Sequence, residues 1–375
     1  MQSTDAEKHK ILYLSFNQDS SCFCTGTEDG FVIYSINPFQ EIFHRSKKII
    51  NNKKFKLYIL YRSWGRNWKN RELKTTNILA LVGGGKKPKF ALNKIIIWDD
   101  NKNRVIGELR FNSKILNVKI KMDRIVGVIE KKIYIFNINT LDTIDMFDTF
   151  ENTNGICAFS SGDLISVLAF PSEKQGIVKV INFNSLSQPP LIEAHESKIA
   201  CLSINQNGTL LATASDKGTL IRVFNVSDAK LLAELRRGTK TAEINCIVFD
   251  EQNKYVGCTS VMGTLHIFSI VSAMKNLDEN YYSEVIEEEP KNQKSFLNKF
   301  NFISKINNSY LNSEWSFAKF RVPEHRSIFT FLENNMISVL TSDGKWYLAS
   351  FDPKKPGDCE KLKESYIYNV DKKGK

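Results

Sequence analysis

The chain has 375 residues, of which 42% are apolar and 25% charged, a composition that predicts a globular protein with a sizeable core. The formal net charge of +11 favours anionic partners such as nucleic acid, acidic protein or anionic lipid. The polar first ten residues argue against a secretory signal, and no apolar run approaches the roughly 20 residues that span a bilayer. Seven scattered cysteines predict buried free thiols in a reducing compartment and no metal site.

Short β-rich runs recur along the whole chain, separated by Gly, Asp and Asn turns, and convincing helices are nearly absent. In chain order the clearest runs are 11–16, 31–36, 94–98, 133–137, 177–183, 220–226, 265–270 and 337–341. Such a chain predicts a sandwich, a barrel or a propeller.

A repeated turn-and-strand motif favours the propeller. Asp29-Gly30-Phe31-Val32-Ile33-Tyr34 returns around Gly176, Gly218, Gly263 and Gly344, and the spacings from 176 to 218 and from 218 to 263 are 42 and 45 residues. This period is that of one four-stranded blade, with the glycine between the second and third strands. We therefore expect an all-β, seven-bladed, WD-repeat-like propeller over residues 1–375 as a single domain, with blades beginning near residues 8, 55, 112, 152, 194, 241 and 324.

Two segments interrupt this period. The first, about 44–75, interleaves many Lys and Arg residues with aromatic residues, a pattern of either a nucleotide-stacking surface or a solvated insertion. The second, about 271–314 in blade six, contains an amphipathic stretch from 296 to 310. Its apolar arc packs on the propeller itself or enters a membrane, and pattern alone leaves both open. The residues expected to insert are Phe296, Leu297, Phe300, Phe302, Ile303 and Ile306.

The stretch from Leu231 to Ala242 contains two neighbouring arginines, Arg236 and Arg237, before Gly238. Successive side chains on a strand point to opposite faces, so the two arginines cannot both serve one pocket. Guanidinium groups suit bidentate binding of phosphate oxygens, which predicts two anion sites, one on each side. The alternative is a solvated edge strand that ends at a glycine turn.

Blades five and six each supply hydroxyl groups on the second strand, a glycine turn, a threonine and a basic side chain on the third strand. Hydroxyls, a cation and free backbone N–H groups are what a phosphate needs. The alternative is structural, because a His and a Ser or Thr also form internal networks that lock WD-type blades. His195 with Ser215 fits that structural role.

Several motifs resemble the PROPPIN family, the WIPI-type β-propellers that bind polyphosphoinositides and act in autophagy. The family signature corresponds to Leu235-Arg236-Arg237-Gly238 at the end of blade five. Further similar motifs, in the order of the family, are Leu81–Gly85, Ile97–Asp100, Asn154–Cys157, Leu168–Pro171, Ala212–Ser215, Gly218–Arg222 and Ser313–Ala318.

The resemblance implies two headgroup sites on the rim, for phosphatidylinositol 3-phosphate and phosphatidylinositol 3,5-bisphosphate. Site one would comprise His195, Ser215, Lys217, Thr219, Arg222 and Arg236. Site two would comprise Arg237, Thr239, Ser260, Thr264 and His266. The resemblance also implies that the long loop of blade six dips into the membrane, and that other surfaces recruit lipid-transfer or conjugation machinery of the growing autophagic membrane.

These observations predict a non-enzymatic peripheral membrane protein, monomeric in solution and without cofactor or metal. We expect it in the cytoplasm and on autophagic (phagophore), endosomal or vacuolar membranes. One rival is a WD-type protein scaffold without lipid specificity. The other is a nucleic-acid binder that uses residues 45–75, although no nucleic acid partner is expected. An enzyme is the least favoured class, because the five histidines form no evident catalytic motif.

Overall fold

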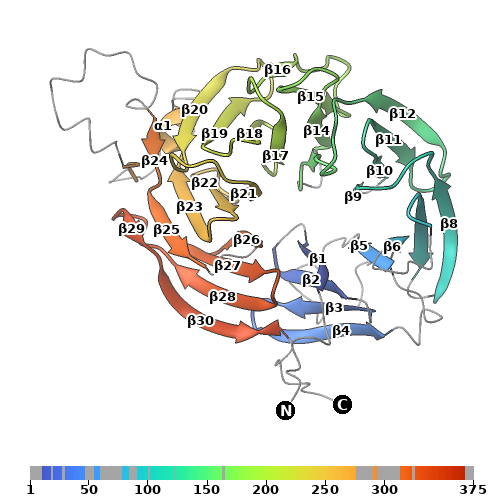
Figure 1. Cartoon of the computed structure of the whole chain (residues 1–375), viewed down its shortest axis with the longest axis horizontal. Coiled ribbons are helices and arrows are strands. Elements are labelled where there is room, and N and C mark those ends of the chain that lie inside the picture. Colours follow the sequence, from blue (N-terminus) through green and yellow to red (C-terminus); the bar gives the residue numbers. More distant parts are fainter. Residues whose placement is uncertain are drawn as a thin grey trace. The chain divides into compact units, whose positions relative to one another are not determined.

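The computed structural model describes residues 11–17, 20–27, 30–46, 55–59, 78–83, 91–99, 102–121, 123–162, 165–275, 290–293, 313–322 and 326–367. Over these residues the chain is all-β apart from one short helix, α1 (Val271–Lys275). By its internal contacts the chain divides into two compact units. Figure 1 shows the strands of both units, coloured along the sequence. Unit 1 comprises Met1–Ile156, Ser342–Lys345 and Ser365–Lys375, and unit 2 comprises Cys157–Thr341 and Trp346–Glu364.

Three four-stranded antiparallel sheets form unit 1 in the part of the chain that the structure describes. The first consists of β1 (Ile11–Phe16), β2 (Cys22–Thr27), β3 (Gly30–Ser35) and β4 (Gln40–Ser46). The second consists of β5 (Phe55–Ile59), β6 (Ile78–Gly83), β7 (Lys94–Asp99) and β8 (Arg104–Arg110). The third consists of β9 (Asn117–Lys121), β10 (Arg124–Val128), β11 (Lys132–Asn137) and β12 (Thr143–Asp148).

Four further sheets form unit 2 within the described ranges. They begin with β13 (Ala158–Phe159), β14 (Val167–Pro171), β15 (Ile177–Asn182) and β16 (Ile192–Glu193). Next come β17 (Ile199–Ile204), β18 (Leu210–Ser215), β19 (Leu220–Asn225) and β20 (Leu231–Arg236). The sixth sheet contains β21 (Ile244–Phe249), β22 (Tyr255–Ser260), β23 (Thr264–Ser269) and β25 (Ala318–Arg321). The last contains β26 (Ser327–Leu332), β27 (Met336–Thr341), β28 (Lys345–Ser350) and β30 (Glu360–Tyr366).

Each of these seven sheets has the strand order of a propeller blade, because strands that follow one another in sequence are neighbours in the sheet. Their first strands begin at residues 11, 55, 117, 158, 199, 244 and 327. The prediction of seven four-stranded blades is therefore confirmed, and we number the blades in chain order.

Blades five and six each carry a short fifth strand that pairs in parallel with the fourth. In blade five it is β24 (Glu314–Trp315), which returns from the long connection of blade six and lies beside β20. In blade six it is β29 (Gly357–Asp358), beside β25. Trp315 therefore pairs with blade five, whereas Ala318–Arg321 form the fourth strand of blade six.

Glycines in the left-handed region make the turns between second and third strands. The φ angles of Gly176, Gly218, Gly263 and Gly344 are 75°, 58°, 69° and 89°. At Gly218 a Cβ atom would also lie 1.9 Å from the carbonyl oxygen of Ala242. The backbone conformation favours glycine at all four positions, and at Gly218 the lack of space also requires it, which explains the repeat in the sequence.

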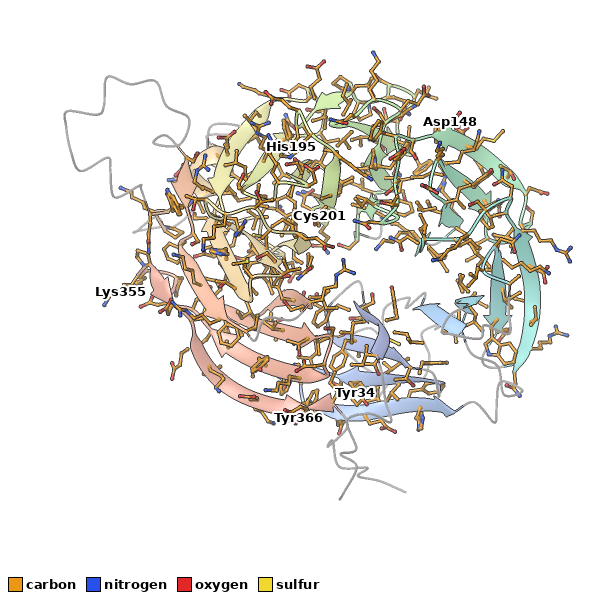
Figure 2. All side chains as sticks on the ribbon, viewed as in Figure 1. Tyr34, Asp148, His195, Cys201, Lys355 and Tyr366 are labelled. Atoms are coloured by element: carbon orange, nitrogen blue, oxygen red, sulfur yellow. The ribbon has the colours of Figure 1, made fainter. Side chains whose placement is uncertain are left out.

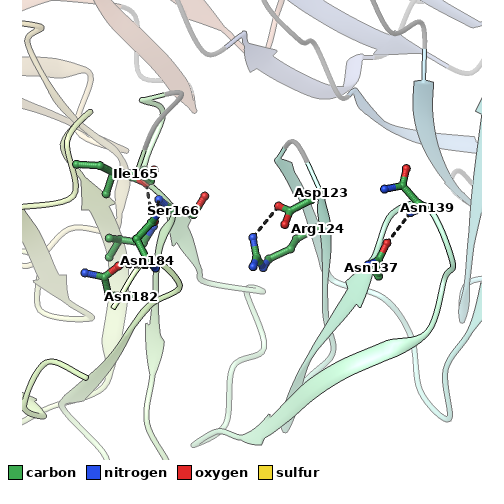
Figure 3. A network of polar contacts seen from close by, with 10 residues as sticks. Asp123, Arg124, Asn137, Asn139, Ile165, Ser166, Asn182 and Asn184 are labelled. Carbon is green, nitrogen blue, oxygen red and sulfur yellow. Dashed lines mark hydrogen bonds and ion pairs between the residues drawn. The ribbon is translucent and has the colours of Figure 1, made fainter. Parts of the chain in front are cut away.

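A second repeated feature, an Asx turn, lies at the end of several third strands. An Asp or Asn side chain at the last position accepts a backbone N–H from the turn that follows in blades two, three, four and five, at Asp99, Asn137, Asn182 and Asn225. Figure 3 shows two of these Asx turns, in which the donors are the N–H groups of Asn139 at 2.8 Å and Asn184 at 3.0 Å. The same figure shows the ion pair of Asp123 with Arg124 in blade three and the bond from the Ser166 N–H to Asn184 in blade four.

The core of unit 2 is continuous between blades five and six. Ala214, Ile221 and Leu235 of blade five are buried in one cluster with Ile244 and Cys258 of blade six. The first strands of these two blades, β17 and β21, also contact each other. This shared core fixes the end of β20 against blade six, and that end carries the two arginines.

Candidate functional site

Arg236 and Arg237 stand where β20 leaves blade five, and both are buried, with 8% and 6% of their surface exposed. Arg236 is the last residue of the ladder and lies opposite Leu220 on β19. The Arg237 N–H continues this pairing by donating to the Thr219 carbonyl at 2.9 Å. The backbone is therefore extended through both residues.

The Arg236 guanidinium contacts the segment that returns from the long connection of blade six. Its Nη2 donates to the Ser313 hydroxyl oxygen at 3.1 Å, and that hydroxyl lies 3.5 Å from a carboxylate oxygen of Glu234. Ser313 is itself 4% exposed. Arg236 is thus joined to a serine and, through it, to an acid on its own strand.

The Arg237 guanidinium contacts different groups. Its Nε donates to the Gly218 carbonyl at 2.9 Å, and its Nη2 donates to the Lys240 carbonyl. Desolvation by burial lowers the pKa of Arg237, and no carboxylate within the described residues offsets that effect. The two neighbouring guanidinium groups therefore have separate partners, and in the part of the chain that the structure describes, Arg237 is a buried cation whose hydrogen-bond partners are carbonyl oxygens.

In the first predicted set, His195 is part of an internal lock. Its Nε2 lies 2.9 Å from the Thr213 hydroxyl of β18, and burial, followed by the charge of Arg222, lowers the pKa of His195 to about 4 (Figure 2). The imidazole is therefore neutral at physiological pH. The sequence suggested Ser215 as the partner in such a lock, whereas the structure pairs His195 with Thr213.

Arg222 on β19 is also engaged within the blade. Its Nε and Nη2 lie 3.0 and 2.9 Å from one carboxylate oxygen of Glu234, and its Nη1 donates to the Ala194 carbonyl at 2.7 Å. An anion at Arg222 would have to compete with this carboxylate. Arg222 is therefore charge-neutralised in a way that Arg237 is not.

The remaining residues of the first set lie around the hairpin of blade five. Ser215 is buried and its carbonyl closes the turn by accepting the Gly218 N–H at 3.0 Å. Lys217 is exposed at the tip, and Thr219 is half-buried beside the Arg237 backbone. The hairpin places an exposed ammonium group and a hydroxyl near the end of β20.

In the second predicted set, His266 is the most constrained residue. Its Nδ1 lies 3.2 Å from the Ser316 hydroxyl, and its ring stacks on Phe268 at 6.3 Å between centroids. Burial, followed by the charges of Lys319 and Arg237, lowers the pKa of His266 to about 3. Arg237, His266 and Lys319 therefore form one basic group, in which Lys319 lies opposite His266 in the ladder of β25 with β23.

The hydroxyl residues of this second set differ in exposure. Ser260 is buried at the end of β22, Thr264 is half-buried at the start of β23, and Thr239 is exposed on the connection that follows Arg237. Ser260 and Thr264 border the same hairpin turn, which is closed by a hydrogen bond of 3.2 Å from the Gly263 N–H to the Ser260 carbonyl.

Sequence reasoning missed four polar residues at these sites. They are Glu234, Ser313, Ser316 and Lys319. Glu234 could have been found, because it precedes Arg236 by two residues and therefore shares its face of the strand. The two serines belong to the motif 313–318 noted above, whereas nothing local in the sequence indicates Lys319.

The six residues expected to enter a membrane, Phe296, Leu297, Phe300, Phe302, Ile303 and Ile306, lie outside the described residues. The chain on either side of them is tied down. The Asn292 side chain donates to the Ser269 carbonyl at 2.6 Å and to the Glu314 carboxylate at 2.5 Å, and the Trp315 N–H donates to the Gln293 carbonyl at 2.8 Å. None of the helices in the described ranges has the length and hydropathy needed to cross a bilayer.

Known proteins resemble the chain over nearly its whole length. A model of the PROPPIN family matches residues 11–367. Autophagy-related protein 18e of Arabidopsis thaliana is 31% identical over 370 residues, covering 97% of this chain and 90% of that protein. Autophagy-related protein 18 of Dictyostelium discoideum is 31% identical over 364 residues, covering 94% and 92% of the two chains.

Solved structures agree on the fold. Kluyveromyces lactis Hsv2 matches with a TM-score of 0.71 and 20% identity, over 96% of this chain and 99% of that one. The structure of KlAtg21 in complex with the coiled-coil of AgAtg16 matches with a TM-score of 0.68 and 21% identity, over 95% and 99%. Together with the family match, these similarities show that the chain is a seven-bladed, WD-repeat-like β-propeller and belongs to the PROPPIN family.

Proposed function

We propose that this protein is a non-enzymatic peripheral membrane protein of autophagy or membrane trafficking. It binds phosphatidylinositol 3-phosphate and phosphatidylinositol 3,5-bisphosphate through two sites, one completed by Arg236 and the other by Arg237. It thereby associates with autophagic, endosomal or vacuolar membranes and recruits other proteins of the pathway. Membership of the PROPPIN family and similarity to autophagy-related proteins support this role.

The observation that carries the proposal is the state of Arg237. A buried guanidinium whose pKa is lowered by desolvation is costly to keep charged, and here only carbonyl oxygens are bonded to it in the described residues. A phosphate monoester would supply the missing negative charge through short charge-assisted hydrogen bonds. Lys319 beside His266 adds a second cation to the same group.

The contacts of Arg236 support the first site less directly. The hydrogen-bond partner of Arg236, Ser313, is uncharged. However, the Glu234 carboxylate lies near the same serine and pairs with the neighbouring Arg222. A headgroup at this site therefore competes with an internal carboxylate. We infer that this site is the weaker of the two, and that both together give the avidity which a reversible membrane protein requires.

Protein recruitment rests on a separate observation. KlAtg21, a structural neighbour, is seen in complex with the coiled-coil of AgAtg16. We propose by analogy that this chain also uses part of its surface for an autophagy protein, while blades five and six face the lipid.

Vesicle flotation tests the lipid function. Arg236→Thr with Arg237→Thr should abolish binding to phosphatidylcholine vesicles that contain phosphatidylinositol 3-phosphate, and each single variant should weaken it. The matched control is Arg104→Thr with Arg110→Thr, which removes the same charge from the exposed strand β8. Retained flotation of a folded double variant, or equal loss in the control, would refute the proposal.

A further inference from the structure

The hairpin tip between β22 and β23 in blade six exposes two consecutive apolar side chains. Val261 and Met262 are 38% and 44% exposed. They form the turn itself, because the Gly263 N–H donates to the Ser260 carbonyl at 3.2 Å. Both side chains therefore project from the end of a rigid two-strand ladder.

The corresponding tips of the other blades are charged. In blades one, three, four, five and seven they read Glu28-Asp29, Glu130-Lys131, Glu173-Lys174, Asp216-Lys217 and Ser342-Asp343. The longer connection of blade two carries Lys86, Lys87 and Lys89. Blade six alone has a connection between its second and third strands with no charged residue, so the apolar pair is a departure from the repeat and not a feature of the fold.

This tip is tied to the residues that follow the two arginines. The connection from 238 to 243 runs between the hairpins of blades five and six. Its Ala242 N–H donates to the Lys217 carbonyl at 3.2 Å, and its Glu243 carbonyl accepts the Val261 N–H at 3.1 Å. The hairpin tips of blades five and six are thus both hydrogen-bonded to the short segment that follows Arg237.

Basic side chains outnumber acidic ones around the tip, although the exposed acid Asp216 lies next to Lys217. Lys217, Lys240 and Arg321 are exposed, and Arg321 lies opposite Thr264 in the ladder of β25 with β23. The Glu243 carboxylate is paired with Arg326. Exposed apolar residues set among cations match the interfacial region of an anionic bilayer, where acyl chains lie beneath phosphate groups.

We propose that Val261 and Met262 form an apolar wedge that enters the headgroup layer of an anionic membrane while Arg237 holds a phosphate. The inference rests on the proposed lipid function and adds a membrane contact built from a rigid hairpin of the propeller. Because the wedge touches acyl chains and not the inositol ring, it strengthens binding to a bilayer but not to a free headgroup.

That distinction defines the experiment. Val261→Ser with Met262→Ser should weaken binding to phosphatidylcholine vesicles containing phosphatidylinositol 3-phosphate by about tenfold, since apolar area is no longer buried. Binding of soluble inositol 1,3-bisphosphate, measured by calorimetry, should not change. Val105→Ser with Ile106→Ser is the matched control, because this pair on β8 is 48% and 44% exposed and should have no effect on either measurement.

A second measurement reports the position of the tip. Met262→Trp should show blue-shifted emission on vesicles and quenching by brominated acyl chains, unlike the control Val105→Trp. The wedge proposal is refuted if the serine variant binds vesicles with unchanged affinity, or if vesicles do not change the emission of the indole at position 262. Either result would mean that the tip faces solvent or a protein partner. Loss of inositol bisphosphate binding in the serine variant also overturns the proposal, by showing damage to the site. If the wild-type protein does not bind such vesicles, the proposed lipid function fails as well.

Discussion

Arg222 and Glu234 form an ion pair across the paired strands β19 and β20, with two guanidinium nitrogens within 3.0 Å of one carboxylate oxygen. The other carboxylate oxygen lies 3.5 Å from the Ser313 hydroxyl, which accepts a hydrogen bond from Arg236. One acid is therefore shared, directly or through a hydroxyl, by two arginines of the first predicted site. Its negative charge therefore lies close to both arginines of the first proposed site.

Glu234→Gln should therefore strengthen binding of inositol 1,3-bisphosphate at low ionic strength by about three- to tenfold, because one repulsive charge is removed while a side-chain oxygen still accepts from Arg222. The gain should shrink as salt is added. Glu108→Gln is the matched control, because Glu108 also lies on a fourth strand and pairs with a third-strand cation, Lys94, at 2.7 Å. Unchanged or weaker binding by Glu234→Gln in calorimetry would contradict this prediction.

Removal of the charge of Asp250 should increase the free energy of unfolding. Burial raises the pKa of Asp250 to about 6 from 3.8, so the folded state disfavours its ionised form. That penalty is fully present above about pH 6 and is relieved as the pH falls toward 4. Asp250→Asn should stabilise the fold at pH 7 by about 1 kcal/mol after solvent screening.

The asparagine should fit this turn, because Asn205 makes the equivalent bond in blade five. Its Oδ1 accepts the Leu210 N–H at 2.9 Å, as the Asp250 carboxylate accepts the Tyr255 N–H at 2.6 Å. Urea unfolding at pH 7 and pH 5 measures the effect. A variant no more stable than wild type at pH 7 would show that the carboxylate is not penalised.

The lowered pKa of His195 should make the stability of the fold sensitive to acid. Its folded pKa of about 4 lies below the ordinary 6.5, so the unfolded chain binds the proton more readily. Stability should therefore fall as the pH decreases from 6.5 to 4, by about 2 to 3 kcal/mol from this residue. His195→Gln should flatten that dependence in thermal melts, whereas His44→Gln on the exposed part of β4 should leave it as in wild type. Parallel curves for His195→Gln and wild type would count against the assignment.

The two glycines near the arginines should respond differently to alanine. Gly218 has a φ of 58° and the Ala242 oxygen 1.9 Å from a Cβ position, whereas nothing lies within 4 Å of a Cβ at Gly238. Gly218→Ala should destabilise the fold by about 2 kcal/mol or more, and Gly238→Ala by less than about 0.5 kcal/mol. Equal unfolding midpoints in urea would disprove the distinction. Gly238→Ala also tests whether the open space beside it matters for vesicle binding.

The fold could be predicted from the sequence because the repeat of its turn glycines has a physical cause. Gly218 and Gly263 must adopt a left-handed conformation at the same point of each blade, so the period survives where other residues vary. The third-strand turn at Asp99 or Asn137 recurs for a similar local reason. The pairing of β24 with blade five could not be predicted from the sequence, because it joins Trp315 to a strand that is far away in the chain.

The candidate site was accessible only in part. Alternation along a strand predicts separate surroundings for Arg236 and Arg237, and the structure gives the two guanidinium groups different hydrogen-bond partners. It does not say that His195 is locked to Thr213, or that Arg222 is already neutralised. Packing between strands decides which polar side chains are already hydrogen-bonded within the blade. No local pattern in a single sequence records that packing.

The fifth strand of blade five has a structural consequence. β24 pairs residue by residue with the end of β20, Glu314 with Leu235 and Trp315 with Arg236. The chain that connects the third and fourth strands of blade six is thus anchored to blade five before it joins β25. Because Ser313 also accepts a hydrogen bond from Arg236, any rearrangement of residues 313–315 would change the surroundings of that arginine directly.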